Sequence, residues 1–316
     1  MSEIKTESIW LKSDYQEQPL AVYVVSCPSV TPHAILQVTH GMAEYWMRYE
    51  GFAAFMAQHG YVVCGNDHLG HGATSGSEYP DGFFAPKNGR EYVVQDVHQV
   101  TEYIRTRYPA LPLILFGHSM GSFIVRWATE RWPNAQCAAI YCGTGGKNPA
   151  AGAGLLLTSA ISALRGPQYV SRFVENLAFG SYQKRIETPK TSVDWLSVDE
   201  ENVQKYVADP KCGFPFTVSA FHELMAMVQH VNTDEWAQHI PQNLPVLVVA
   251  GREDPVGDYG NGPQEVARRL QDAGVRRVTL KLYDGMRHEI LNETDRQTVW
   301  NDLLAWCEQT LANIRS

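Results

Sequence analysis

The chain has 316 residues, of which 44% are hydrophobic and 19% charged, and this composition excludes a disordered chain or a coiled coil. Its formal net charge of −8, without any basic run, gives no electrostatic basis for binding nucleic acid. The first residues carry neither the basic nor the apolar stretch of a signal peptide, and no run of about 18 apolar residues predicts a membrane span, so we expect a cytoplasmic protein.

Seven short apolar runs predict the β-strands of the chain. Most of them are apolar throughout rather than alternating, which is the pattern of strands buried on both faces of a parallel sheet. The runs cover residues 20–27, 34–38, 61–64, 113–116, 138–142, 246–250 and 278–283.

Amphipathic helical patterns lie between these strands. In two of them the apolar residues repeat at i, i+4, i+7 and i+11, so that they line one face of a helix. Strands that alternate with helices predict right-handed crossovers and an α/β fold with a mostly parallel, doubly wound sheet, whose ligands bind beyond the carboxyl ends of the strands. The repeating residues are Val93, Val97, Val100 and Ile104 in the segment 91–107, and Trp300, Leu304, Cys307 and Leu311 near the end of the chain.

The alternation of strands and helices stops at about residue 143 and resumes at residue 245. We therefore predict an inserted, mainly helical cap (lid) at residues 147–240, and a core domain made of residues 1–146 and 241–316. Within the cap, residues 150–164 form an apolar segment that is too short to span a bilayer. It is interpreted either as a buried cap helix or as a lid that lines an acyl-chain tunnel or touches a lipid surface, and both can hold.

A candidate nucleophile stands between the predicted strand 113–116 and a helical stretch at 122–131. Residues 117–121 read Gly-His-Ser-Met-Gly. A nucleophile elbow turns so tightly from strand to helix that the residues two before and two after the serine must be small. A Gly-x-Ser-x-Gly match alone is weak, but in this context it predicts that Ser119 is the nucleophile.

A serine hydroxyl needs a base to remove its proton, and in this fold the residues follow the chain order serine, acid, histidine. His288 is the one histidine beyond the run 246–250, and it stands a few residues after the last predicted strand. The imidazole in turn needs an acceptor that fixes its tautomer. We favour Asp254, in the loop that leaves the run 246–250, although Glu253 and Asp258 are close enough in sequence to compete.

Backbone N–H groups are expected to stabilise the tetrahedral oxyanion that forms during ester hydrolysis. One should come from Met120, the residue after the nucleophile. The second should come from Met42, because residues 40–44 read His-Gly-Met-Ala-Glu and follow the strand 34–38 directly.

A metal site is the alternative that His68 and His71 raise, because they have the His-x-x-His spacing of some zinc sites. No third or fourth ligand is evident near them, which favours a structural loop. We expect neither a metal nor an organic cofactor, since the chemistry of the serine needs none.

Five motifs together resemble the monoacylglycerol lipase and lysophospholipase group of serine α/β-hydrolases, which are similar to the S33 serine aminopeptidases. The resemblance extends over nearly the whole chain outside the cap. It implies the α/β-hydrolase fold and a carboxylic-ester hydrolase of single-chain acyl lipids, with the triad and oxyanion residues proposed above. The motifs are His-Gly-Met-Ala-Glu at 40–44 with Arg48 and Tyr49, Asp-His-x-Gly-His-Gly at 67–72, Gly-His-Ser-Met-Gly at 117–121, Gly-x-x-Asp-Pro at 251–255, and His288 with Glu289.

Other functions stay open at this point. A small-ester carboxylesterase, an aminopeptidase or an amidase would use the same triad, and a peptidase would need acidic cap residues to hold the substrate amine. Glu200, Glu201 and Glu223 are candidates for that role. A non-catalytic relative is expected to lack a triad residue, and none is missing. The expected partner is a small acyl ester or lipid, with transient contact between the cap and a membrane surface as a second interpretation, and the oligomeric state is not predicted.

Overall fold

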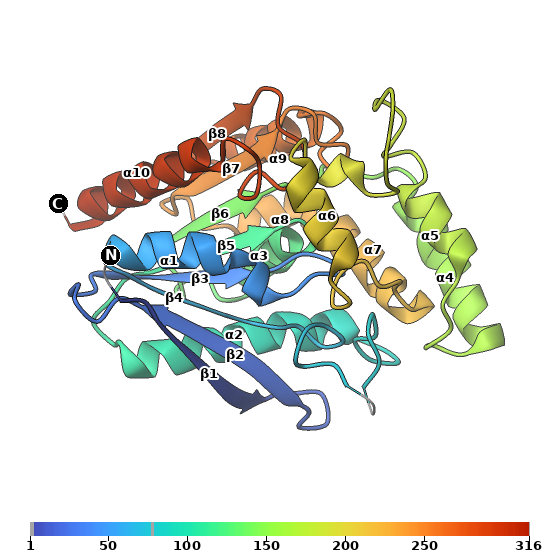
Figure 1. The fold of residues 1–316 in the computed structure, drawn as a ribbon, viewed down its shortest axis with the longest axis horizontal. Helices are drawn as coiled ribbons and strands as arrows, with labels where there is room; N and C mark the ends of the chain where they lie inside the picture. The colour runs from blue at the N-terminus through green and yellow to red at the C-terminus, as the bar shows by residue number, and fades with distance from the viewer. Residues whose placement is uncertain (1–2, 77–78, 316) are drawn as a thin grey trace.

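A single eight-stranded sheet runs through the centre of the molecule, in a computed structural model that describes residues 3–76 and 79–315 (Figure 1). Its strands lie in the order β1-β2-β4-β3-β5-β6-β7-β8. The pairs β1–β2 and β2–β4 are antiparallel, and all other neighbours are parallel. The predicted mostly parallel sheet is therefore confirmed.

Seven of the eight strands match the predicted apolar runs to within a few residues. The strand β1 was not predicted, because this edge strand alternates exposed and half-buried residues and has no continuous apolar run. At the opposite edge, β8 is more exposed than its predicted place among buried strands implied. The strands are β1 (Lys5–Lys12), β2 (Pro19–Ser26), β3 (Ala34–Thr39), β4 (Tyr61–Asn66), β5 (Leu113–His118), β6 (Ala138–Cys142), β7 (Val246–Gly251) and β8 (Val278–Tyr283).

Helices cover both faces of the sheet, and successive residues of each buried strand pack on opposite faces. In β3, Ile35 joins the hydrophobic cluster under α2, α3 and α9, whereas Leu36 joins the cluster under α1 and α10. The helices of the first cluster are α2 (Gly89–Arg107), α3 (Met120–Arg131) and α9 (Asn261–Asp272), and those of the second are α1 (Glu50–Gln58) and α10 (Arg296–Arg315). The doubly wound arrangement fixes the carboxyl ends of the parallel strands at one edge.

The segment between β6 and β7 is helical and adds no strand to the sheet. Helix α4 packs on α7, which in turn contacts α2 and α3 of the core, and α8 contacts α3 and α9. In Figure 1, α4 and α5 lie farthest from the sheet, with α7 between α4 and the core. Within the described ranges, no helix is long and apolar enough to cross a membrane. The elements of the segment are α4 (Ala151–Arg165), α5 (Arg172–Phe179), the 3-10 helix η2 (Asp194–Leu196), α6 (Glu200–Ala208), α7 (Val218–Val231) and α8 (Asp234–His239).

Candidate active site

Ser119 occupies the turn between β5 and α3, in a backbone conformation that residues other than glycine rarely adopt. Its φ is 53° and its ψ −121°, and its N–H donates a 3.0 Å hydrogen bond to the carbonyl of Cys142. The flanking glycines permit the turn: a Cβ on Gly121 would lie 2.1 Å from the carbonyl oxygen of Thr39, and one on Gly117 would lie 2.2 Å from that of Gly121. The strained turn that the motif predicted is therefore present.

His288 forms a hydrogen-bonded pair with Asp254, and both side chains are buried. The Nδ1 of His288 lies 2.9 Å from Oδ2 of Asp254, whose Oδ1 accepts a 2.8 Å hydrogen bond from the N–H of Val256. The competing carboxylates Glu253 and Asp258 are both exposed. The structure thus brings Asp254, and neither of its two neighbours, against the histidine.

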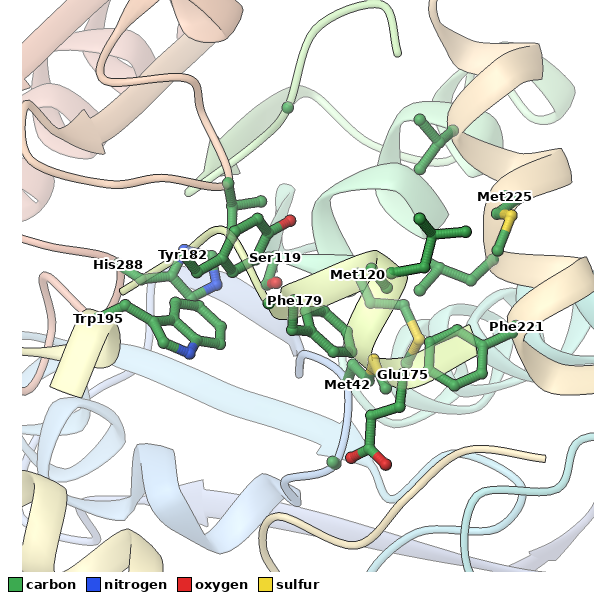
Figure 2. A pocket seen from close by; sticks show the side chains of 18 of the residues that line it. Met42, Ser119, Met120, Glu175, Phe179, Tyr182, Trp195, Phe221, Met225 and His288 are labelled. Atoms are coloured by element: carbon green, nitrogen blue, oxygen red, sulfur yellow. The ribbon is translucent and has the colours of Figure 1, made fainter. Parts of the chain in front are cut away.

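Ser119 and His288 line the same cavity, beyond the carboxyl ends of β5 and β6. Figure 2 shows Ser119 with His288, Tyr182 and Trp195 on one side and Met120, Phe221 and Met225 on the other. Within the described chain the hydroxyl of Ser119 has no hydrogen-bond partner, so it is free to rotate toward a base or a substrate.

Met42 and Met120 also line this cavity, beside Ser119. Met120 is the first residue of α3, where the backbone N–H groups have no acceptor inside the helix. In the part of the chain that the structure describes, neither of these two N–H groups donates a hydrogen bond. Two unpaired backbone donors next to a serine are what an oxyanion needs.

Buried side chains hold the loop of residues 40–43 in place. The N–H of Gly41 donates a 2.6 Å hydrogen bond to Oε1 of Glu44. The N–H of Ala43, a residue with a φ of 51°, donates a 3.2 Å hydrogen bond to Nε2 of His71. The loop that carries Met42 is therefore fixed on both sides of this residue.

His40, His68 and His71 form a buried cluster of rings under this loop. His71 accepts at Nε2 and lies with Nδ1 2.9 Å from the carbonyl of Leu69, which requires the neutral imidazole. Burial lowers the pKa of His71 to about 3 and also lowers the pKa of His40. Neutral, hydrogen-bonded rings give these histidines a structural role in the loop.

A network of buried charged and polar side chains contacts the backbone of His288. Nε2 of His118 lies 3.1 Å from the carbonyl of His288, and its Nδ1 lies 3.2 Å from Oε1 of Glu44. Arg48 forms ion pairs with Glu44 and with Glu289. Burial by itself lowers the pKa of His118, but the hydrogen bond and charge of Glu44 outweigh it and raise the pKa above the usual value. Burial raises the pKa of Glu44, but His118 and Arg48 outweigh it and hold this pKa well below its usual range.

The cavity has a volume of about 520 Å³, and most of its walls are apolar. An aromatic wall closes the side near His288, because Trp195 lies 5.2 Å from the ring of His288 and Tyr182 packs edge-on against Trp195. The apolar residues of the remaining walls come from the core and the inserted helices alike. They include Met42, Met120, Phe123, Leu157, Val174, Leu177, Phe179, Phe214, Phe221, Leu224, Met225 and Val228.

The acidic residues considered for a peptidase site do not line this cavity. Glu200 and Glu201 are exposed, and Glu223 is buried in an ion pair with Arg90. Glu175 of α5 does line the cavity and has no ion-pair or hydrogen-bond partner for its carboxylate among the described residues. In Figure 2 its carboxylate points away from Ser119.

Sequence reasoning assigned no function to several residues that contact the site. Arg48 and Glu289 were part of the recognised motifs, and His118 was the variable residue of the serine motif, a polar side chain at the end of an apolar strand. Their pairing was not predictable, because they come from three separate segments of the chain. For Asn202 and Tyr206 of α6, which also join this network, the sequence gives no comparable signal.

Comparison with known proteins matches residues 30–295 to the family described as serine aminopeptidase, S33. A monoacylglycerol lipase of Mycolicibacterium smegmatis is 28% identical over 290 residues, which cover 90% of this chain and 91% of that protein. The monoglyceride lipase of Homo sapiens is 26% identical over 300 residues, covering 90% and 86%. The crystal structure of a thermostable carboxyl esterase from Bacillus coagulans, in complex with glycerol, superposes with a TM-score of 0.89 at 29% identity, covering 96% of this chain and 98% of that one. The predicted α/β-hydrolase fold is confirmed.

Proposed function

The chain belongs to the serine aminopeptidase S33 family of hydrolases, and from this premise we propose that it is a serine carboxylic-ester hydrolase of single-chain acyl lipids such as monoacylglycerols or lysophospholipids. The observation that carries the proposal is the position of Ser119, on a strained turn in an apolar cavity that it shares with the Asp254–His288 pair. A hydrolase of this kind needs an activated hydroxyl and room for an acyl chain.

In the proposed reaction, Oγ of Ser119 attacks the carbonyl carbon of the ester while His288 accepts the proton of the hydroxyl. The tetrahedral intermediate collapses when His288 passes this proton to the leaving alcohol oxygen, leaving an acyl-enzyme on Ser119. Water then attacks the acyl-enzyme with the same base and releases the fatty acid. Asp254 holds the Nδ1–H tautomer of His288 and stabilises the imidazolium.

The backbone N–H groups of Met42 and Met120 stabilise the oxyanion in this scheme. Both lie beside Ser119, and both lack a competing acceptor within the described residues. Removing one donor of an oxyanion hole typically costs about 10²–10³ in kcat. No metal or cofactor enters any step of the proposed reaction.

The acyl-chain preference is inferred from the cavity. Methionine and aromatic side chains line the cavity beside Ser119. They suit a hydrocarbon chain, because they offer apolar surface and methionine adapts its shape. The relatives named monoacylglycerol and monoglyceride lipases support the same substrate class.

We propose that residues 147–240 act as the cap and that their outer surface meets the lipid surface that holds the substrate. Large apolar side chains of α4 and α5 face solvent: Leu156 is 76% exposed, Leu164 84% and Phe173 64%. Their neighbour Leu157 lines the cavity, so one helix reaches both the outer surface and the site. Exposed apolar groups that gather next to a site mark an interaction surface.

Labelling with a fluorophosphonate tests the nucleophile directly. The wild-type protein should be labelled on Ser119, the Ser119→Ala variant should not, and hydrolysis of a medium-chain p-nitrophenyl ester should disappear with it. Equal labelling or equal turnover of the two proteins would overturn the assignment.

An aminopeptidase activity is the second candidate, since the family carries that name. Its structural support is the carboxylate of Glu175, which lines the cavity and has no partner within residues 3–76 and 79–315. Turnover of p-nitrophenyl esters of several chain lengths, compared with aminoacyl arylamides, separates the two functions. We expect ester hydrolysis to exceed arylamide hydrolysis by orders of magnitude.

A further inference from the structure

Helix α6 of the inserted segment touches both halves of the proposed catalytic machinery. On one side it contacts the loop that carries Met42, and on the other it contacts the segment that carries His288. These two segments lie far apart in the sequence, one before α6 and one after it.

The contact with the oxyanion loop is made at Ala43, the residue after Met42. The hydroxyl of Tyr206 donates a 3.0 Å hydrogen bond to the carbonyl of Ala43, and the N–H of Gly213 donates a 2.9 Å hydrogen bond to the same oxygen. Tyr206 is buried, and Arg48 lies 4.9 Å above its ring. Because the φ of Ala43 is positive, its peptide groups are held in an unfavourable conformation that these bonds help to maintain.

The contact with the histidine segment is made at Glu289, the residue after His288. Nδ2 of Asn202 donates a 2.7 Å hydrogen bond to Oε2 of Glu289, and Oδ1 of Asn202 accepts one of 3.2 Å from Arg48. The N–H of Glu289 itself donates a 2.7 Å hydrogen bond to the carbonyl of Leu196 in η2. Ala43 and Glu289 are thus both hydrogen-bonded to residues 196–213 of the insertion.

From this arrangement we infer that Tyr206 and Asn202 are positioning residues: Tyr206 aims the N–H of Met42, and Asn202 fixes the segment of His288. Tyr206 lines the cavity, but its hydroxyl already donates to the carbonyl of Ala43, and Asn202 is not among the residues that line the cavity, so neither donates to the substrate in this scheme. The inference rests on the proposed function of Ser119. It adds that the insertion, besides covering the cavity, sets the geometry of the oxyanion site.

The test compares Tyr206→Phe with a matched control, Tyr45→Phe. The hydroxyl of Tyr45 donates a 2.7 Å hydrogen bond to Asp209, so the control also removes a hydrogen bond between the core and the insertion, but one that reaches neither Ala43 nor Glu289. Rates are normalised by fluorophosphonate titration of Ser119, which counts only folded active sites. Absence of labelling in the wild-type protein would refute the proposed function rather than this inference.

We expect Tyr206→Phe to lower kcat for a p-nitrophenyl ester about five- to thirtyfold with KM within about twofold, because one of two hydrogen bonds to Ala43 is lost. Affinity for an alkyl trifluoromethyl ketone, which forms a tetrahedral oxyanion with the serine, should fall by a similar factor. Affinity for an uncharged ether analogue of the substrate should not change, and neither should any of these values in Tyr45→Phe.

Three results would overturn the inference. They are an unchanged kcat, an equal loss in Tyr45→Phe, or a loss of affinity for the ether analogue that matches the loss for the ketone, since the last would make Tyr206 a substrate-binding residue. If Tyr206→Phe yields no folded protein, Asn202→Leu answers the same question. It should lower kcat without lowering the affinity for the ether analogue. An unchanged kcat with a lower affinity for the ether analogue would contradict the inference.

Discussion

Two parts of the insertion differ in how they contact the core. The outer half, α4 with α5, exposes large apolar side chains, among them Leu156 and Phe173. The anchored half, η2 with α6, is bonded to the core on both sides of the candidate site, at Ala43 and at Glu289. In the proposed function, one insertion therefore combines a surface for substrate capture with a support for catalytic geometry.

The two halves should also differ in how much stability is lost when a contact is removed. Removing one partner of a buried, charge-assisted pair such as those of Arg48 costs far more than removing an exposed contact, because it leaves a buried charge unpaired. Substitutions in the two halves should therefore differ in their effect on stability and activity.

Arg48→Leu should lower the free energy of unfolding by about 3–5 kcal/mol, because it leaves Glu44 and Glu289 buried without their cation. Arg48 belongs to the core and reaches the anchored half through its hydrogen bond to Asn202. Arg165→Leu is the matched change on the outer half, where the guanidinium stacks on Tyr169 at the surface. It should alter the free energy of unfolding by less than about 0.5 kcal/mol. Urea denaturation of the two variants measures both values, and similar losses would erase the distinction between the halves.

Glu289→Gln should destabilise the protein in a pH-dependent way. Burial alone raises the pKa of Glu289, but the charge and hydrogen bonds of Arg48 outweigh it and hold the pKa below its ordinary value of 4.5. A carboxyl group with a lowered folded pKa stabilises the protein above the unfolded pKa, and this stability is lost as the pH falls through the folded pKa. The variant should therefore be about 2 kcal/mol less stable at pH 7, and the gap should shrink below pH 4.5. A stability difference that stays constant from pH 7 to pH 3 would contradict the lowered pKa of Glu289.

The double change Leu156→Ser with Phe173→Ser should act on substrate capture alone. We expect about tenfold slower hydrolysis of a monoacylglycerol presented in phospholipid vesicles, equal to about 1.4 kcal/mol of lost surface affinity. Hydrolysis of a soluble short-chain ester should be unchanged, since neither side chain lines the cavity. Equal losses on both substrates would mean that these residues support the site itself.

Glu175→Gln gives the smallest expected effect. The carboxylate lines the cavity but points away from Ser119, so hydrolysis of neutral acyl esters should stay within about twofold of the wild-type rate (Figure 2). Steady-state kinetics with esters and aminoacyl arylamides would measure it. A large loss confined to arylamides would favour the aminopeptidase candidate.

Sequence reasoning was strongest where the chemistry is local. The turn around Ser119 needs small residues at fixed offsets, so its conformation could be predicted from five letters, and the order of Asp254 and His288 after it follows from the fold. The strand β1 escaped prediction because its residues alternate between exposed and half-buried and form no continuous apolar run. The division of the insertion could not be predicted, since it depends on contacts between residues far apart in the chain, such as Tyr206 with Ala43.

In the proposed mechanism, the ester is cleaved through an acyl group carried by Ser119. Acid quenching of the wild-type protein during turnover of a p-nitrophenyl ester, followed by peptide mass spectrometry, measures this most directly. We predict an acyl adduct on Ser119 and on no other residue, with neither adduct nor turnover in Ser119→Ala. An adduct on a different residue, or undiminished turnover in Ser119→Ala, would contradict this mechanism.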